Sequence, residues 1–182
     1  MSKAAWVLSV GLLATPVWAE EKLPLSPVCW PPNFAGIVLG VTTDPEVERL
    51  LGKGLFVKAD GDTGGRYFID AKRTATLHSV SYTDRVVGEL TLEQGVAVAP
   101  ADERRATSRW FDPTGGFGNW HALRLGSTKE EVKENLGAPD ANERTDNRWR
   151  YDSKCACELE VFFTVHFKND RINKVVFSAP PG

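Results

Sequence analysis

Apolar and polar residues alternate with a period of two near the end of the chain. Residues 161–168 read VFFTVHFK, and every second residue from Val161 onward is apolar. This alternation is typical of a strand with one buried face. Lys168 to Arg171 predict a tight turn, and residues 172–177 predict the returning strand of a hairpin. Further strands are predicted on the same grounds at residues 67–69, 74–82, 85–92 and 149–151.

Two segments instead have apolar residues spaced three and four apart, which predicts amphipathic helices. In the first, Val47, Leu50 and Leu51 form the stripe, and Pro45 suits a first helical position. The second begins at a capping box and contains Val132 and Leu136. Two pairs of residues can form that box: Ser127 with Glu130, or Thr128 with Glu131. A glycine in the left-handed conformation is expected to end each helix: Gly52 and Gly137.

The segments around these helices resemble each other, which indicates an internal repeat. Residues 33–52 read NFAGIVLGVTTDPEVERLLG, and residues 119–137 read NWHALRLGSTKEEVKENLG. Asn33 and Asn119 are candidate N-caps of a short helical turn that precedes each helix. The expected fold class is therefore α+β, with two tandem repeats that are each a helix–loop–helix packed on a small antiparallel β-sheet.

The same patterns divide the chain into six segments. They are a signal peptide (1–19), a Pro-rich N-terminal segment (20–32), repeat 1 (33–95), a linker (96–118), repeat 2 (119–178) and a tail (179–182). The linker is either a mobile hinge or a strap packed by Trp110 and Phe117.

The N-terminus has the character of a secretory signal peptide. Lys3 precedes an apolar run, and Val17 and Ala19 place small residues at a cleavage site after Ala19. No cysteine follows the run directly, so we expect a periplasmic or secreted protein without a lipid anchor. No other stretch reaches 18 apolar residues, so we expect no stable membrane insertion after the signal is removed.

Composition narrows the function classes further. The 182 residues include 22 Lys and Arg against 24 Asp and Glu, a formal net charge of −2. Such a balanced chain has no strong positive field to recruit nucleic acid. Apolar residues make up 42% of the chain, which is ordinary for a globular protein.

Three cysteines are the most unusual chemical feature. Cys155 and Cys157 are two residues apart, and in a strand this separation is at the upper limit for a disulfide. The structural interpretation pairs Cys29 with either of them, and the functional one makes Cys155 and Cys157 a thiol redox pair or a soft-metal site. Thiol titration separates the two: one free thiol per chain indicates a disulfide, and three with bound metal indicate the alternative.

No other constellation indicates catalysis or a cofactor. His78, His121 and His166 lack the spacing of a zinc site. Asp60 and Asp62 lie in a Gly-rich turn that lacks the later ligands of a calcium loop. We therefore expect no enzyme activity, no metal and no cofactor.

The repeated pattern also resembles a known family. LGSTKEEVKENLGAP, RWRY and VFFTVHFKNDRINKVVF are similar to the tandem-repeat β-lactamase inhibitory proteins and to the small SmpA/OmlA lipoproteins of the outer-membrane β-barrel assembly machinery. The resemblance implies a two-helix unit on an antiparallel sheet and a role in binding another protein, either an envelope component or a hydrolase. The candidate contact residues outside the motif are Trp30, Asp60, Asp62 and Trp110.

Overall fold

The computed structural model describes residues 33–58, 64–82, 85–117, 123–139, 141–154 and 160–179, with only the backbone at 152–154 and 160. The signal peptide and the Pro-rich segment predicted for residues 1–32 lie outside the described residues, and they remain predictions.

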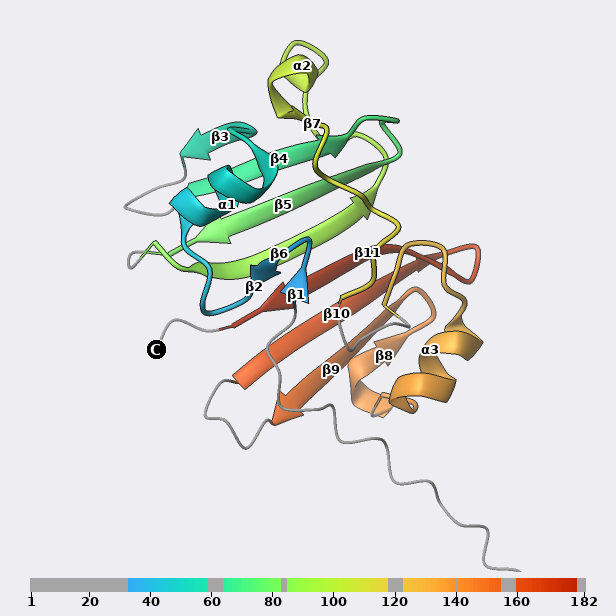
Figure 1. Cartoon of the computed structure of the whole chain (residues 1–182). Helices are drawn as coiled ribbons and strands as arrows, with labels where there is room; N and C mark the ends of the chain where they lie inside the picture. The colour runs from blue at the N-terminus through green and yellow to red at the C-terminus, as the bar shows by residue number, and fades with distance from the viewer. Residues whose placement is uncertain are drawn as a thin grey trace, which may run out of the picture.

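One nine-stranded sheet organises the described chain (Figure 1). Eight strands run antiparallel in the order β3-β4-β5-β6-β11-β10-β9-β8, and β7 adds to β4 in parallel. Their bounds are β3 Leu55–Lys58, β4 Gly64–Asp70, β5 Ala75–Ser81, β6 Val87–Gln94, β7 Thr107–Ser108, β8 Arg144–Thr145, β9 Arg148–Lys154, β10 Glu160–Lys168 and β11 Arg171–Ser178. A separate hairpin joins β1 (Asn33–Phe34) to β2 (Ile37–Val38).

The helices are short. They are α1 (Asp44–Leu51), α2 (Glu103–Ala106), α3 (Lys129–Leu136) and the 3₁₀ turn η1 (Ala141–Glu143). Of the two predicted capping boxes, the structure contains the one that joins Thr128 and Glu131: the Thr128 amide donates to Glu131 Oε2 at 2.7 Å, and the Glu131 amide donates to Thr128 Oγ1 at 3.2 Å. In the part of the chain that is described, no helix has the length and apolarity needed to cross a membrane.

The expected fold class is wrong, because the protein is mostly β and has one large sheet in place of two small ones. The first predicted helical turn is the β1–β2 hairpin. Ala35 (φ 55°) and Gly36 (φ 84°) turn the chain in the left-handed region, and Asn33 pairs with Val38 as a strand residue. In the first half, α1 alone therefore follows a hairpin where a helix–loop–helix was expected. Asn119, the cap predicted for the matching turn of the second half, lies outside the described residues.

The two halves of the sheet contain matching backbone bonds and meet at the centre. The Val87 amide donates to Thr42 O at 2.9 Å, and the Ile172 amide, 85 residues later, donates to Ser127 O at 2.8 Å. β6 and β11 are the innermost strands, and they pair with Thr91 opposite Val176. Because β6 and β11 each have a neighbour on both sides, the halves form one continuous sheet.

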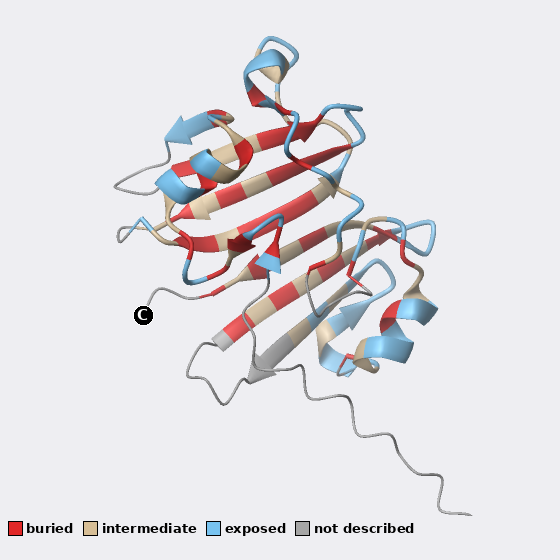
Figure 2. Cartoon of the chain, viewed as in Figure 1, coloured by how far each residue is buried: buried red, intermediate tan, exposed pale blue. Residues whose placement is uncertain are grey.

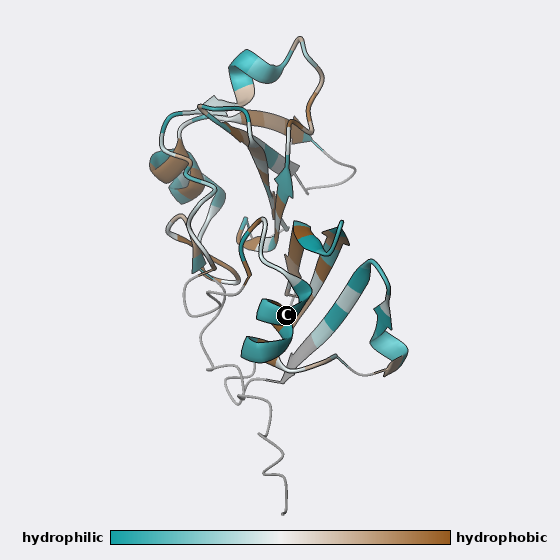
Figure 3. Ribbon diagram, turned by 90° about the vertical axis from the view of Figure 1, so that its right-hand side faces the viewer, coloured by the Kyte–Doolittle hydropathy of each residue, from teal (hydrophilic) through white to brown (hydrophobic). Residues whose placement is uncertain are grey.

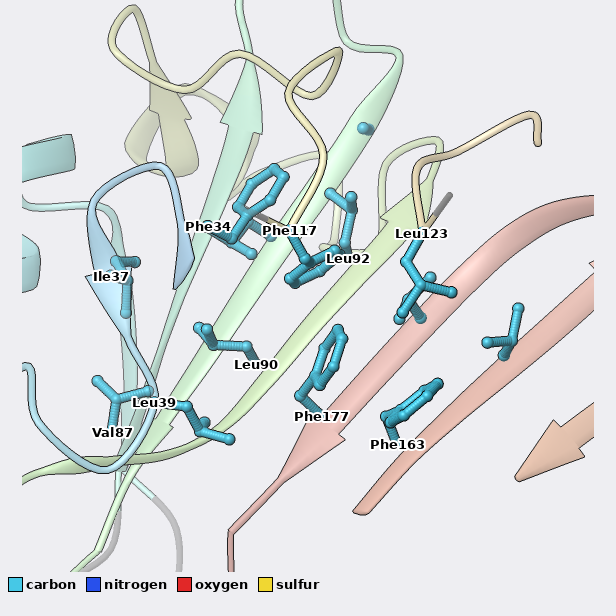
Figure 4. Packing of buried hydrophobic residues seen from close by; sticks show 14 of the residues in the cluster. Phe34, Ile37, Leu39, Val87, Leu90, Leu92, Phe117, Leu123, Phe163 and Phe177 are labelled. Carbon is cyan, nitrogen blue, oxygen red and sulfur yellow. The ribbon is translucent and has the colours of Figure 1, made fainter. Parts of the chain in front are cut away.

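The core lies on the face of the sheet that α1, α3 and the β1–β2 hairpin cover (Figure 4). Phe34, Phe117, Phe163 and Phe177 pack there as a chain of rings. Phe117 lies 4.8 Å from Phe34 and 4.5 Å from Phe177, and Phe177 lies 5.3 Å from Phe163, between ring centroids. A smaller cluster, separate from this main core, consists of Leu55, Ile69 and Ala106. It lies where residues 96–106 cover β3 and β4.

The described part of the linker is packed and not extended into solvent. Phe111 and Phe117 are buried, and Ser108 Oγ donates to Leu51 O at 2.6 Å. Trp110 was predicted either to pack the linker or to contact a partner, and it is 62% exposed. The Arg109 guanidinium lies 4.5 Å from the centre of its ring.

Candidate functional site

The face of the sheet opposite the main core has alternate side chains that are only half-buried. Along β10, buried Val161, Phe163 and Val165 alternate with half-buried Phe162 and Thr164, and Figure 2 shows this as red and tan bands. Figure 3, turned by 90°, shows α1 on one side of the strands. The face between β5 and β9 that lies opposite the main core is here called the open face, and its side chains range from buried Thr91 to exposed Arg148 and Arg150. It consists of His78, Val80, Glu89, Thr91, Glu93, Arg148, Arg150, Phe162, Thr164, His166, Lys174, Val176 and Ser178.

Strand register arranges these side chains in rows across the sheet. The central row is His78, Thr91, Val176, Thr164 and Arg150, each directly opposite the next on the neighbouring strand. The other two rows are Glu93, Lys174, His166 and Arg148, and Val80, Glu89, Ser178 and Phe162. Side chains directly opposite on one face are about 5 Å apart at Cβ, so each row is a continuous surface.

Charge divides the open face. Glu89 and Glu93 lie on β6, whereas the cationic side chains lie on β11 and β9. Lys174 Nζ bonds Glu93 Oε2 at 3.2 Å, where the two halves meet. Arg150 lies with its guanidinium 5.1 Å from the Phe162 ring centroid, so the basic side also has an aromatic contact. The face therefore changes from acidic to basic across the central strands.

Both described histidines lie on this face and are held neutral. The ring of His78 stacks on Tyr67 at 4.0 Å with an interplanar angle of 10°. Burial, together with the positive charge of Lys174, lowers the pKa of His78 to about 4. Burial lowers the pKa of His166 as well, and Lys174 and Arg148 add to this effect. At neutral pH the histidines therefore contribute polar, uncharged rings to the face.

The depressed pKa of His78 predicts an acid-sensitive contribution to stability. The unfolded chain binds a proton at His78 near pH 6.5, and the folded chain does so only near pH 4. The contribution of neutral His78 to the free energy of unfolding is therefore fully present above about pH 6.5 and is lost as the pH falls toward 4. As pH falls from 6.5 to 4, the free energy of unfolding should fall by about 2 kcal/mol more in the wild type than in His78→Gln. Urea unfolding of both proteins at pH 7 and pH 4 measures this difference. Carboxyl groups titrate in both, so equal losses would contradict the prediction.

Most residues predicted as site residues lie outside the described part of the chain. These are Ala19, Cys29, Trp30, Asp60, Asp62, His121, Cys155 and Cys157. Of the predicted partner contacts, Trp110 alone has a described position, and it is exposed. Within the described ranges, no group of three or more His, Cys, Asp or Glu side chains is arranged to hold a metal ion.

Sequence reasoning predicted the strands of the open face, but it indicated which residues face outward on β10 alone. Phe162, Thr164 and His166 were correctly predicted to share one face of a strand. His78 lies on the open face with Val80, a position that its lack of zinc-site spacing did not indicate. The signal that could have found the acidic part is the alternation of Glu89 and Glu93 with Leu90 and Leu92 along β6.

Comparisons with known proteins give little further guidance. No known protein family matches the chain, and no curated protein matches it either. Among solved structures, the chain is similar to the crystal structure of a DUF4309 family protein (YjgB) from Bacillus subtilis subsp. subtilis str. 168. The two are 15% identical with a TM-score of 0.46, over 79% of this chain and 82% of that chain.

The expected resemblance to the β-lactamase inhibitory proteins and the SmpA/OmlA lipoproteins is wrong. The described chain forms one large, mostly antiparallel sheet, not a tandem helix–loop–helix repeat. The resemblance depended on a motif of a glycine, a capped helix and then alternating strands. This motif describes local structure that unrelated folds can share.

Proposed function

We propose that this protein is an exported, non-enzymatic module that binds another protein, an envelope component or a hydrolase, on the open face of its sheet. The observation that carries the proposal is the division of this half-buried face into an acidic and a basic side. A partner with the opposite order of charges is attracted in one orientation only, and the reverse orientation places like charges together.

The packing of the face also supports binding. Val176 supplies apolar area at its centre and Phe162 supplies it in an outer row, where the Arg150 guanidinium lies over the Phe162 ring. Arginine and aromatic residues are enriched in protein interfaces. Because paired strands already hold these side chains, a partner that contacts them loses little conformational entropy on binding.

The proposal is tested by capture of a partner from envelope extract on the mature protein, residues 20–182. Val176→Lys places a charged side chain at the centre of the open face, and it should reduce the captured partner at least tenfold. Lys133→Glu is the matched control, because Lys133 is an exposed residue of α3 on the opposite side of the sheet. Equal capture by wild type and Val176→Lys, or loss with Lys133→Glu alone, contradicts the proposal.

A further inference from the structure

β3 is an edge strand with apolar side chains exposed on both faces. It pairs with β4 through Leu55 opposite Tyr67 and Lys58 opposite Gly64. No strand in the described ranges pairs with its other edge. Among the described residues, the backbone N–H and C=O groups along that edge therefore have no strand partner, and such an edge can pair with another extended chain.

The two central residues of β3 make this edge unusual. Phe56 is 47% exposed and Val57 is 46% exposed, and successive residues of a strand point to opposite faces. Edge strands are normally protected by shortness, proline or charge. At the opposite edge of the sheet, β8 has this protection, because it consists of Arg144 and Thr145 alone, both exposed. β3 has four residues, no proline and a single charge at its end, Lys58.

The exposed ring of Phe56 is held in place. The Arg66 guanidinium lies 5.3 Å from its centroid, and Arg66 is itself fixed by Asp44 at 2.7 Å and Glu48 at 3.1 Å. On the inner side the ring lies against Gly64, where an added Cβ would come within 2.5 Å of Cζ of Phe56. An ordered aromatic ring beside open backbone groups is prepared to bind, because little side-chain freedom remains to be lost.

We propose that β3 accepts an extended segment of a different protein as an additional strand. The segment has two consecutive apolar residues, which cover Phe56 on one face and Val57 on the other, and its ends are acidic or uncharged. Backbone hydrogen bonds supply the binding, and the apolar pair supplies selectivity, as in other cases of strand addition.

The charges at the ends of β3 favour a segment of a different protein, rather than a second copy of this chain, as the strand that pairs with it. Lys53 and Lys58 lie at the two ends of the edge, and both are exposed. An antiparallel pair of β3 strands from two copies, in the register that pairs all four residues, would place Lys58 of each copy two residues from Lys53 of the other. Like charges at this separation oppose the pairing, whereas acidic ends of a partner segment would favour it.

This site lies on β3, two strands beyond β5, where Val57 continues the row of Val80 across Gly65. Different variants test this site and the open face, so the two proposals can fail independently. The probe is a synthetic eight-residue peptide with glutamate at both ends, threonine inside and Val-Phe at its centre. Its matched control has the same sequence with the four central amides N-methylated, which keeps the side chains and removes the backbone donors. Binding is followed by amide chemical shifts of the ¹⁵N-labelled mature protein, up to about 1 mM peptide.

We expect the unmodified peptide to shift the amides of residues 55–58 and the N-methylated peptide to bind at least tenfold more weakly. The double variant Phe56→Thr/Val57→Thr should lose binding, since threonine keeps the strand but removes the apolar area. Val176→Lys should bind the peptide normally. The proposal is overturned by no shift at 1 mM, by equal binding of both peptides, by unchanged binding to the double variant, or by shifts confined to the open face. A concentration-dependent dimer that the double variant abolishes would instead identify a second copy as the occupant and overturn the partner stated here.

Discussion

Phe177→Ala should lower the free energy of unfolding by about 3–5 kcal/mol. Phe177 is completely buried near the C-terminal end of β11, with Phe117 at 4.5 Å and Phe163 at 5.3 Å between ring centroids. Truncation at Cβ removes the ring that joins the linker residue Phe117 to a strand of the second half (Figure 4). Paired strands on both sides of β11 restrain the backbone, so the cavity should not collapse.

Chemical denaturation with urea measures this loss, and Val176→Ala is the matched control. Val176 precedes Phe177 on the same strand, but its side chain points to the open face, where it is half-buried. We expect a loss of about 1 kcal/mol for Val176→Ala, because water already reaches part of that side chain. Similar losses for the two variants would mean that β11 does not lie with Phe177 against the main core.

The periodicity of apolar residues predicted the helices and strands that depend only on residues close together in the sequence. The hairpin expected at residues 161–177 is β10 and β11, and the stripes around Val47 and Val132 are α1 and α3. These signals succeed because alternation along a strand or a helix reports which side chains face the core. The Gly52 and Gly137 amides donate to Glu48 O and Lys133 O after each helix, as expected of residues that end it. Both glycines have positive φ, but their ψ values of −174° and 176° place them outside the left-handed helical conformation that was predicted.

The predicted short helical turn failed because a tertiary contact selects another structure. Asn33 accepts the Gly36 amide at its Oδ1 (3.2 Å) and resembles a helix cap in sequence. In the structure Phe34 and Ile37 lie opposite each other across a two-residue turn, and both are buried in the main core. The burial of two large side chains outweighs the strain of positive φ at Ala35, and no local propensity contains that information.

The joining of the halves could not be predicted, because it depends on pairing between distant residues. β6 and β11 pair Glu93 with Lys174, 81 positions apart. The pair Arg-Tyr occurs in both halves, at residues 66–67 and 150–151, yet Arg66 and Arg150 point to opposite faces. Arg66 contacts Asp44 of α1, whereas Arg150 lies over Phe162 on the open face. A slip of one residue in a strand reverses every side chain, so an aligned residue type does not establish a shared face.

The second large effect should come from Asp70→Ala, at about 3 kcal/mol. Asp70 is 3% exposed and ends β4 at the turn into β5. Its Oδ1 accepts the amides of Thr74 (2.6 Å) and Ala75 (2.7 Å). Its Oδ2 accepts the Lys72 amide (3.1 Å) and Thr74 Oγ1 (3.0 Å). Alanine would leave these donors without their acceptor, at a turn where Arg73 already has a positive φ of 60°.

Asp70→Asn removes the charge and one of the two acceptor oxygens in this turn. Asparagine keeps a carbonyl oxygen for the Thr74 and Ala75 amides, but its NH₂ group cannot accept from Lys72 or Thr74 Oγ1, so we expect a loss of about 1–2 kcal/mol. Hydrogen exchange adds a local test: in Asp70→Ala the Thr74 and Ala75 amides should exchange faster than amides at the centre of β5, because the turn opens before the sheet does. A loss below about 1 kcal/mol for Asp70→Ala, or equal losses for alanine and asparagine, would mean that Asp70 does not hold the turn.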